Sequence, residues 1–98
     1  MKRGYLSAEL DVTNDEIFYG QYMVQVKPVL EHYQARFLIA TDKPEVVEGS
    51  RVVKRIILLE FDSVDLARKF YYSEEYQKVA KIRFRSSLTH LYIMEGLH

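Results

Sequence analysis

The sequence predicts an α+β domain whose elements follow the order strand, helix, strand, strand, helix, strand (βαββαβ). Three observations support this fold class: segments near both ends of the chain alternate apolar and polar side chains, two longer segments repeat apolar residues at helical spacing, and residues 56–59 are all apolar. The chain has 98 residues, of which 48% are hydrophobic, so we expect a single domain over residues 1–98.

The first strand is predicted over residues 5–12, where apolar and polar side chains alternate. A helix follows, with its cap at one of residues 13–14 and acidic residues in its first turn. Its apolar stripe runs to about Tyr33. Pro28 lies inside this stripe, and since proline removes one helical hydrogen bond, we expect a kink or local irregularity over residues 24–28.

The second and third strands are predicted over residues 36–40 and 52–61. The connection between them is longer than the ~2 to 5 residues of most hairpin loops. Residues 45–48 within it are a candidate for a short extra strand. Because so long a connection is unusual in a hairpin, we expect it to pack on another part of the structure, for which a second subunit is one candidate.

The third strand carries apolar side chains on both faces, so both faces must be covered. The next helix is predicted to be capped at Asp62 or Ser63, recapped at Ser73, and to end near Ser86. The last strand is predicted over residues 90–95, where side chains again alternate.

Two right-handed βαβ units of this kind interleave into a four-stranded antiparallel sheet with two helices on one face, which is the ferredoxin-like arrangement. The other face is left bare, although the third strand is apolar there too. We therefore expect a second subunit to cover it, forming a closed two-fold homodimer. The side chains that the first and last strands point into this dimer are Tyr5, Ser7, Glu9, Asp11, His90, Tyr92 and Met94.

Short motifs along almost the whole chain carry a resemblance to a known family. They are Gly4-Tyr5, Asp11-Val12-Thr13, Pro28-Val29-Leu30, Arg36-Phe37-Leu38, residues 44–49, Glu60-Phe61, Tyr72-Ser73, Glu75-Tyr76-Gln77, Arg83 and Glu95-Gly96. In this order and spacing the sequence resembles the domain-of-unknown-function 1330 family. The resemblance implies a dimeric α/β barrel, in a superfamily that also holds cofactor-free monooxygenases, lactone isomerases and haem-binding relatives. It implies no particular reaction.

Composition excludes several classes of function. Lysine plus arginine and aspartate plus glutamate both number 14, so no excess of positive charge is available for binding nucleic acid. The absence of cysteine excludes disulfides, cysteine-ligated zinc and thiol nucleophiles. His32 and His90 lack the spacing of metal ligands, so we expect no metal and no cofactor.

No apolar stretch approaches the ~18 residues of a membrane span, and no apolar signal core follows Met1. We therefore expect a cytoplasmic protein without a membrane partner.

Asp11, Glu9 and His90 are the candidate catalytic residues. Glu9 and Asp11 lie two apart on one strand and share a face, and enclosure can raise the pKa of a carboxyl group into the range of a general base. The alternative is a polar seam at the dimer interface, in which these groups are satisfied by Arg36, Arg55 or water.

Arg36, Arg55 and Arg83 are candidates for an anion pocket that binds a carboxylate. Tyr76 and Arg83 are candidate ligand-binding residues because both occupy motif positions that match the family. The alternative for Tyr76 is a packing role in which its hydroxyl bonds to a neighbour.

Two classes of function follow from these candidates. In the first, the dimer binds or transforms a small organic molecule without a metal, and a small organic acid or a lactone-like compound is the expected ligand class. In the second, the chain is a non-catalytic dimeric interaction or structural module. A pocket lined by Asp11, Glu9 and His90 favours the first class, and a fully paired seam favours the second.

Overall fold

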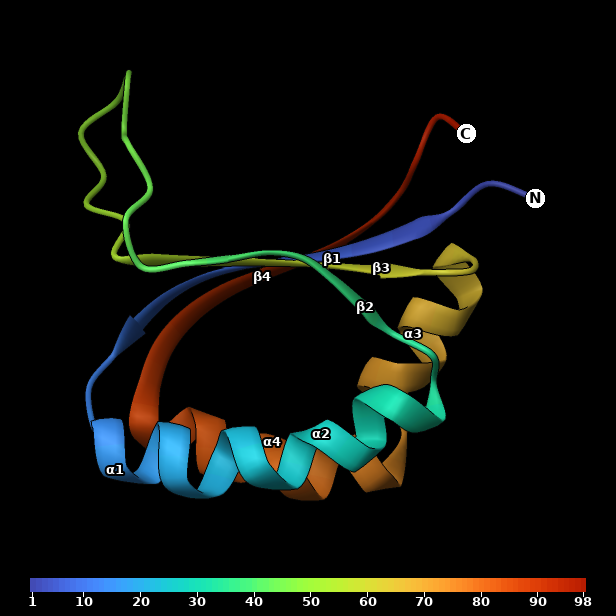
Figure 1. Cartoon of the computed structure of the whole chain (residues 1–98), viewed down its shortest axis with the longest axis horizontal. Helices are drawn as coiled ribbons and strands as arrows, with labels where there is room; N and C mark the ends of the chain where they lie inside the picture. Colours follow the sequence, from blue (N-terminus) through green and yellow to red (C-terminus); the bar gives the residue numbers. More distant parts are fainter.

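The computed structural model describes residues 1–98 and confirms the predicted order of strands and helical regions. Figure 1 shows the arrangement of the elements. They are β1 (Gly4–Val12), α1 (Asp15–Ile17), the π-helical segment η1 (Phe18–Tyr22), α2 (Met23–His32), β2 (Arg36–Thr41), β3 (Arg55–Phe61), α3 (Val64–Tyr72), α4 (Glu74–Ser86) and β4 (Ser87–Glu95).

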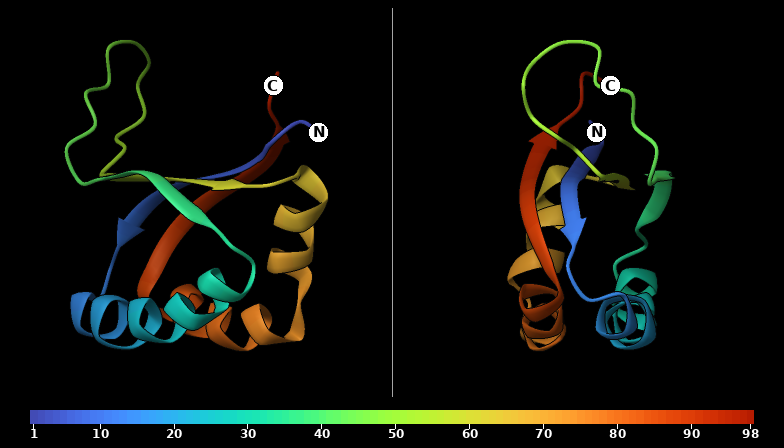
Figure 2. Two further views of the ribbon diagram at one scale, coloured as in Figure 1. Left: turned by 45° about the vertical axis from the view of Figure 1, so that its right-hand side comes forward. Right: turned by 90° about the vertical axis from the view of Figure 1, so that its left-hand side faces the viewer.

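The four strands form one antiparallel sheet in the order β2-β3-β1-β4. The helices lie on one side of the sheet, while both chain ends lie on the other side (Figures 1 and 2). We call the sheet surface that is turned away from the helices the open face. This is the α+β architecture predicted from the sequence, with β1 in the interior of the sheet. Each of the two predicted helical regions is divided, so four α-helical segments and one π-helical segment replace two helices.

The first helical region begins where its cap was predicted. The side-chain oxygen of Asn14 accepts a hydrogen bond from the backbone N–H of Ile17 at 3.1 Å. The predicted position of the irregularity was wrong, because the helix widens over Phe18–Tyr22, before Pro28 rather than at it. The N–H of Met23 bonds to the carbonyl of Phe18, five residues back, and such a turn holds one extra residue.

The second helical region follows its prediction closely. Ser63 caps α3 through a 3.1 Å bond from the N–H of Leu66, and Ser73 caps α4 through a 3.0 Å bond from the N–H of Tyr76. Because Ser73 is extended, it ends one helix and begins the next at a different angle.

The connection between β2 and β3 contains neither a helix nor a strand over residues 42–54. The extra strand expected at residues 45–48 is absent, and β3 begins at Arg55 rather than at Val52. We call residues 42–54 the arm, because they rise from the open face at one end of the sheet (Figures 1 and 2).

The core lies between the sheet and the helices. Ile57, Leu59 and Phe61 of β3 are buried there, whereas Ile56 and Leu58 lie on the open face and are partly exposed. The alternation that was predicted for β3 is therefore confirmed. No helix of the structure is long and apolar enough to cross a membrane.

Candidate functional site

The three candidate catalytic residues lie together on the open face. Glu9 of β1 is directly opposite His90 of β4, and Asp11 is two pairs further along, opposite Leu88. All three line a pocket of about 220 Å³, together with Leu88 and with Arg51, Val52 and Val53 of the arm. The pleat brings them together, because alternate side chains of paired strands share a face.

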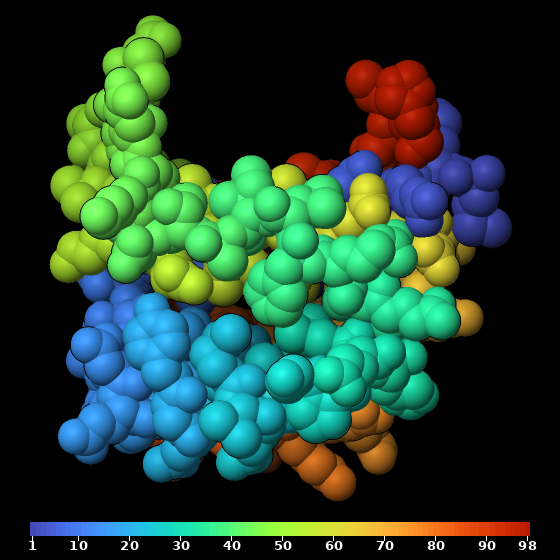
Figure 3. Space-filling model, viewed as in Figure 1, coloured from blue at the N-terminus to red at the C-terminus, as the bar shows by residue number.

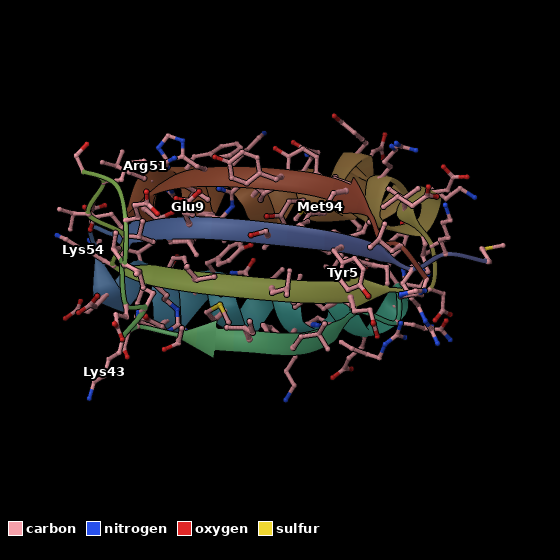
Figure 4. All side chains as sticks on the ribbon, turned by 90° about the horizontal axis from the view of Figure 1, so that it is seen from above. Tyr5, Glu9, Lys43, Arg51, Lys54 and Met94 are labelled. Carbon is pink, nitrogen blue, oxygen red and sulfur yellow. The ribbon has the colours of Figure 1, made fainter.

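Both carboxylates in this open-face pocket are paired with cations from the arm. Arg51 contacts Glu9 at 2.9 Å, and Lys54 contacts Asp11 at 3.4 Å. Figure 4 shows Glu9, Arg51 and Lys54 at the same end of the sheet. The unpaired carboxylate expected of a general base is therefore not present. Sequence reasoning missed Arg51, since its only signal was its position near the end of a long connection.

Arg36 belongs to a separate cluster at the opposite end of the open face. Its Nε donates to Glu60 at 2.9 Å, and its Nη1 lies 3.1 Å from Asp62. The hydroxyl of Tyr5 also donates to Glu60, at 3.1 Å. The hydrogen bond from Arg36 is the main cause that holds the pKa of the Glu60 carboxyl below its ordinary value.

Arg55 is turned to the other side of the sheet. It pairs with Leu10, whose side chain is buried against the helices, and its guanidinium carbon lies 5.9 Å from the centre of the Tyr19 ring. Arg36, Arg55 and Arg83 thus occupy three different places, and the predicted common anion pocket is wrong. Strand parity separates Arg36 from Arg55, and Arg83 lies on a helix rather than on the sheet.

Arg83 and Tyr76 meet inside the core. The Nε of Arg83 donates to the Tyr76 hydroxyl at 3.1 Å, and that hydroxyl shares a 2.8 Å hydrogen bond with the hydroxyl of Tyr22. Arg83 is only 5% exposed, and none of the ion pairs in the structure includes it. Tyr22 lies within the first predicted helical region, and its sequence position carried no sign of this contact.

These three residues border a small cavity between the sheet and the helices. It measures about 40 Å³, and all of its 15 lining residues except Arg83 are apolar or aromatic. We call it the core cavity. Phe37 of β2 lines it too, although that ring is 49% exposed, so Phe37 lies where the cavity approaches the surface.

The electrostatics of the core cavity favour a negatively charged or carbonyl oxygen. Burial raises the pKa of the Tyr22 hydroxyl well above its ordinary value, so Tyr22 is neutral and can donate a proton in a hydrogen bond. Burial lowers the pKa of Arg83, but its contacts with the tyrosines Tyr76, Tyr22 and Tyr71 outweigh that effect and the net shift is upward. Arg83 therefore stays charged, without a carboxylate partner.

No group of three or more histidine, aspartate or glutamate side chains in the structure is arranged to hold a metal ion. Tyr76 and Arg83, which the family resemblance had singled out, lie at a site that is made of phenols, a guanidinium and apolar walls rather than of metal ligands.

The sequence profile of a family described as a domain of unknown function (DUF1330) matches residues 3–97. No curated protein matches the chain significantly.

Solved structures share the fold at low sequence identity. A protein of unknown function from Rhodopseudomonas palustris is 14% identical, with a TM-score of 0.78 over 99% of this chain and 84% of that one. SnoaB, a cofactor-independent oxygenase from Streptomyces nogalater, is 8% identical, with a TM-score of 0.63 over 100% and 96%. A dimeric ferredoxin-like protein from Thermobifida fusca is 12% identical, with a TM-score of 0.53 over 97% and 92%.

Proposed function

Since the chain belongs to the DUF1330 family, we propose that it is a homodimeric protein that binds a small organic acid in the core cavity, without a metal. The observation that carries this proposal is the charge of Arg83, which is buried among apolar side chains and has no carboxylate within ion-pair distance.

A buried cation without a counter-charge is costly to a folded protein. Arg36 shows how this chain neutralises an arginine that has a structural role, because two carboxylates lie beside it. Arg83 has the Tyr76 phenol oxygen at hydrogen-bond distance and the Phe84 ring centre 4.9 Å from its guanidinium carbon, and neither of them carries a negative charge. A ligand carboxylate would provide the missing negative charge, and the Tyr22–Tyr76 hydroxyl pair, which uses one of its two protons in its own hydrogen bond, would donate one further hydrogen bond.

The apolar lining defines the rest of the ligand. A small aromatic or branched body attached to the acid group would bury its surface against the core. The cavity volume of about 40 Å³ has room for only a few water molecules, so such a ligand must displace side chains. Phe37 and Met23 line the cavity and are partly exposed, and their rotation would open it from the edge of the sheet.

The solved structures support the proposal at the level of fold. SnoaB is described as a cofactor-independent oxygenase, so this fold is compatible with chemistry on an organic molecule in the absence of a cofactor. The homodimer is supported by the dimeric ferredoxin-like protein from Thermobifida fusca and by the apolar side chains on the open face. Catalysis on the bound acid would be a further step, and it would depend on the polar groups of the core cavity, which belong to Arg83, Tyr22 and Tyr76.

The test is a titration with benzoate, 2-naphthoate and the corresponding neutral amides, followed by ligand-observed NMR and calorimetry. We expect the acids to bind at least tenfold more tightly than the amides. Arg83→Met should abolish that preference, because methionine fills the space without the charge. Arg85→Met, at an exposed position of the same helix, is the matched control and should bind like the wild type. Equal binding of acids by Arg83→Met and wild type would refute the proposal.

The open-face pocket is a second candidate site, favoured by the fact that Asp11, Glu9 and His90 all line it. There an acid would compete with the Glu9 and Asp11 carboxylates for Arg51 and Lys54. Asp11→Asn and Glu9→Gln separate the two sites, because they remove charge from this pocket alone. If no acid in the panel binds the wild type, the chain is better described as a dimeric interaction module.

A further inference from the structure

The arm exposes apolar side chains far from the core of its own subunit. Val47 is 85% exposed and Val52 is 84% exposed, and Val46 is 45% exposed. These valines lie in residues 42–54, a segment without regular structure that rises above the open face. An exposed apolar cluster on a projecting segment is typical of a surface that contacts another protein.

The lower end of the arm is attached to the sheet. Arg51 and Lys54 form ion pairs with Glu9 and Asp11 of β1, and the Thr41 hydroxyl accepts a 3.1 Å hydrogen bond from the N–H of Lys43. These contacts anchor both ends of the arm beside the sheet, and they hold its middle away from the subunit.

A second projection rises at the other end of the open face. The C-terminal segment is held there by hydrogen bonds from Gly96 N–H to the Arg3 carbonyl at 2.8 Å and from Arg3 N–H to the His98 carbonyl at 2.9 Å. It exposes Leu97 at 85%, next to Met94 at 41%. Figure 3 shows the arm and the chain ends on either side of a hollow above the sheet.

The area of the open face limits how much surface two paired sheets can bury. The molecule extends 35 Å along the sheet and 17 Å across it, so as a flat rectangle the open face covers about 600 Å² per subunit, or about 1,200 Å² in a face-to-face pair. That total is at the lower limit of about 1,200–2,000 Å² for stable interfaces. The sheet alone therefore makes a marginal dimer, and contacts from the two projections would raise the buried area.

We propose that the arm of each protomer crosses the interface and packs Val46 and Val47 against the C-terminal segment of a second copy, beside the partner's Met94 and Leu97. This inference rests on the homodimer proposed above. A two-fold axis that pairs the open faces can place the arm of one copy beside the chain end of the other, and both sides of that contact are apolar. The open-face pocket then lies under the partner and is closed to solvent.

The chain has no cysteine, so introduced cysteines are unique cross-linking positions. Val47→Cys protein is mixed with Leu97→Cys protein carrying a tag of different mass, and a short bis-maleimide is added. We expect the mixed Val47–Leu97 product to exceed either self-linked product at least tenfold. Val24→Cys, at an exposed valine on the helix side, replaces Val47→Cys in the control and should give no mixed product.

Light scattering on the same samples separates this inference from the dimer itself. A dimer whose main product is Val47 linked to Val47, or which gives no linked product, refutes the arm contact while leaving the homodimer intact. A monomer at all concentrations refutes both. As a second measurement, Val46→Ser with Val47→Ser should raise the dissociation constant of the dimer at least tenfold, whereas Val24→Ser should leave it unchanged. An unchanged constant in the double variant counts against the arm contact.

Discussion

At the scale of single residues, two arginines show how neighbours decide the role of a charge. Arg36 lies against Glu60 and Asp62 and is a structural ion-pair partner at the edge of the open face. Arg83 is more deeply buried but meets only the Tyr76 hydroxyl at hydrogen-bond distance. The same side chain is therefore neutralised by carboxylates in one place and left without a carboxylate partner in the other.

Glu60 provides a test of the first cluster through pH. Its pKa in the folded state is lowered by the hydrogen bond from Arg36, so ionised Glu60 stabilises the fold above the ordinary pKa of glutamate, about 4.3. This contribution is lost as the pH falls through the lower pKa of the folded state. Carbon NMR of the carboxyl should give a midpoint below about 4.3. Arg36→Gln should move that midpoint upward, and a wild-type midpoint at or above the ordinary value would contradict the assignment.

Gly4 is predicted to tolerate no side chain. A methyl group at this position would collide with the Ser63 carbonyl and with Val64, where the start of α3 passes close to β1. Gly4→Ala should lower the free energy of unfolding by about 1–3 kcal/mol in urea denaturation, as overpacked sites do. Gly20→Ala is the control, since nothing lies within 4 Å of a methyl group there, and it should be neutral or slightly stabilising. Equal effects of the two substitutions would show that the close approach is absent.

At the scale of elements, Ser73 joins two helices with one hydroxyl. Its hydroxyl oxygen accepts from the Tyr76 N–H at 3.0 Å and its O–H donates to the Phe70 carbonyl at 2.8 Å, so the side chain caps the beginning of α4 and the end of α3. The joint matters for the core cavity, because Phe70 and Tyr76 both line it and their ring centres are 4.5 Å apart.

Replacement of Ser73 should therefore cost more than a surface substitution. Ser73→Ala removes both hydrogen bonds and should lower the free energy of unfolding by about 1–2 kcal/mol. Ser73→Thr keeps the hydroxyl and should retain most of the stability. Both values can be measured by urea denaturation with circular dichroism, and a Ser73→Ala variant as stable as wild type would be inconsistent with a capping role.

At the scale of the whole molecule, the sheet has two faces with different requirements. Ile57 is buried against the helices at 8% exposure, whereas Leu58, its neighbour in β3, is partly exposed on the open face opposite Ser7. One face belongs to the core of the subunit, and the other is available to a second copy.

Adjacent substitutions distinguish these faces. Leu58→Lys should leave the circular dichroism spectrum unchanged and reduce the mass in light scattering from dimer to monomer, because a charge would be buried at the interface. Ile57→Lys should abolish cooperative unfolding, since the same charge would enter the core. A Leu58→Lys protein that remains dimeric at micromolar concentration would rule out pairing through the open face.

The sequence by itself determined most of the secondary structure of this protein. The strands follow from side chains that alternate over a few residues, and the cap at Ser73 follows from a residue type with a local hydrogen-bond partner. For the other two caps the sequence left two adjacent candidates each, of which the structure uses Asn14 and Ser63. It also placed Glu9, Asp11 and His90 on one surface, because strand parity is a local property. The irregularity expected over residues 24–28 was misplaced, because the helix departs from regular geometry in a π-helical turn over Phe18–Tyr22, whose Phe18 and Tyr22 side chains pack in the core.

Only the tertiary structure decided which charges are neutralised. Arg51 reaches Glu9 through a connection that has no regular pattern, so its position could not be read from periodicity. Tyr22 and Tyr76 are 54 residues apart, and their hydrogen bond depends on how two helices cross the same sheet. Local patterns record the neighbours of a residue along the chain, but the partner of a buried or paired charge is set by packing between distant segments. That packing separates the core cavity from the open-face pocket.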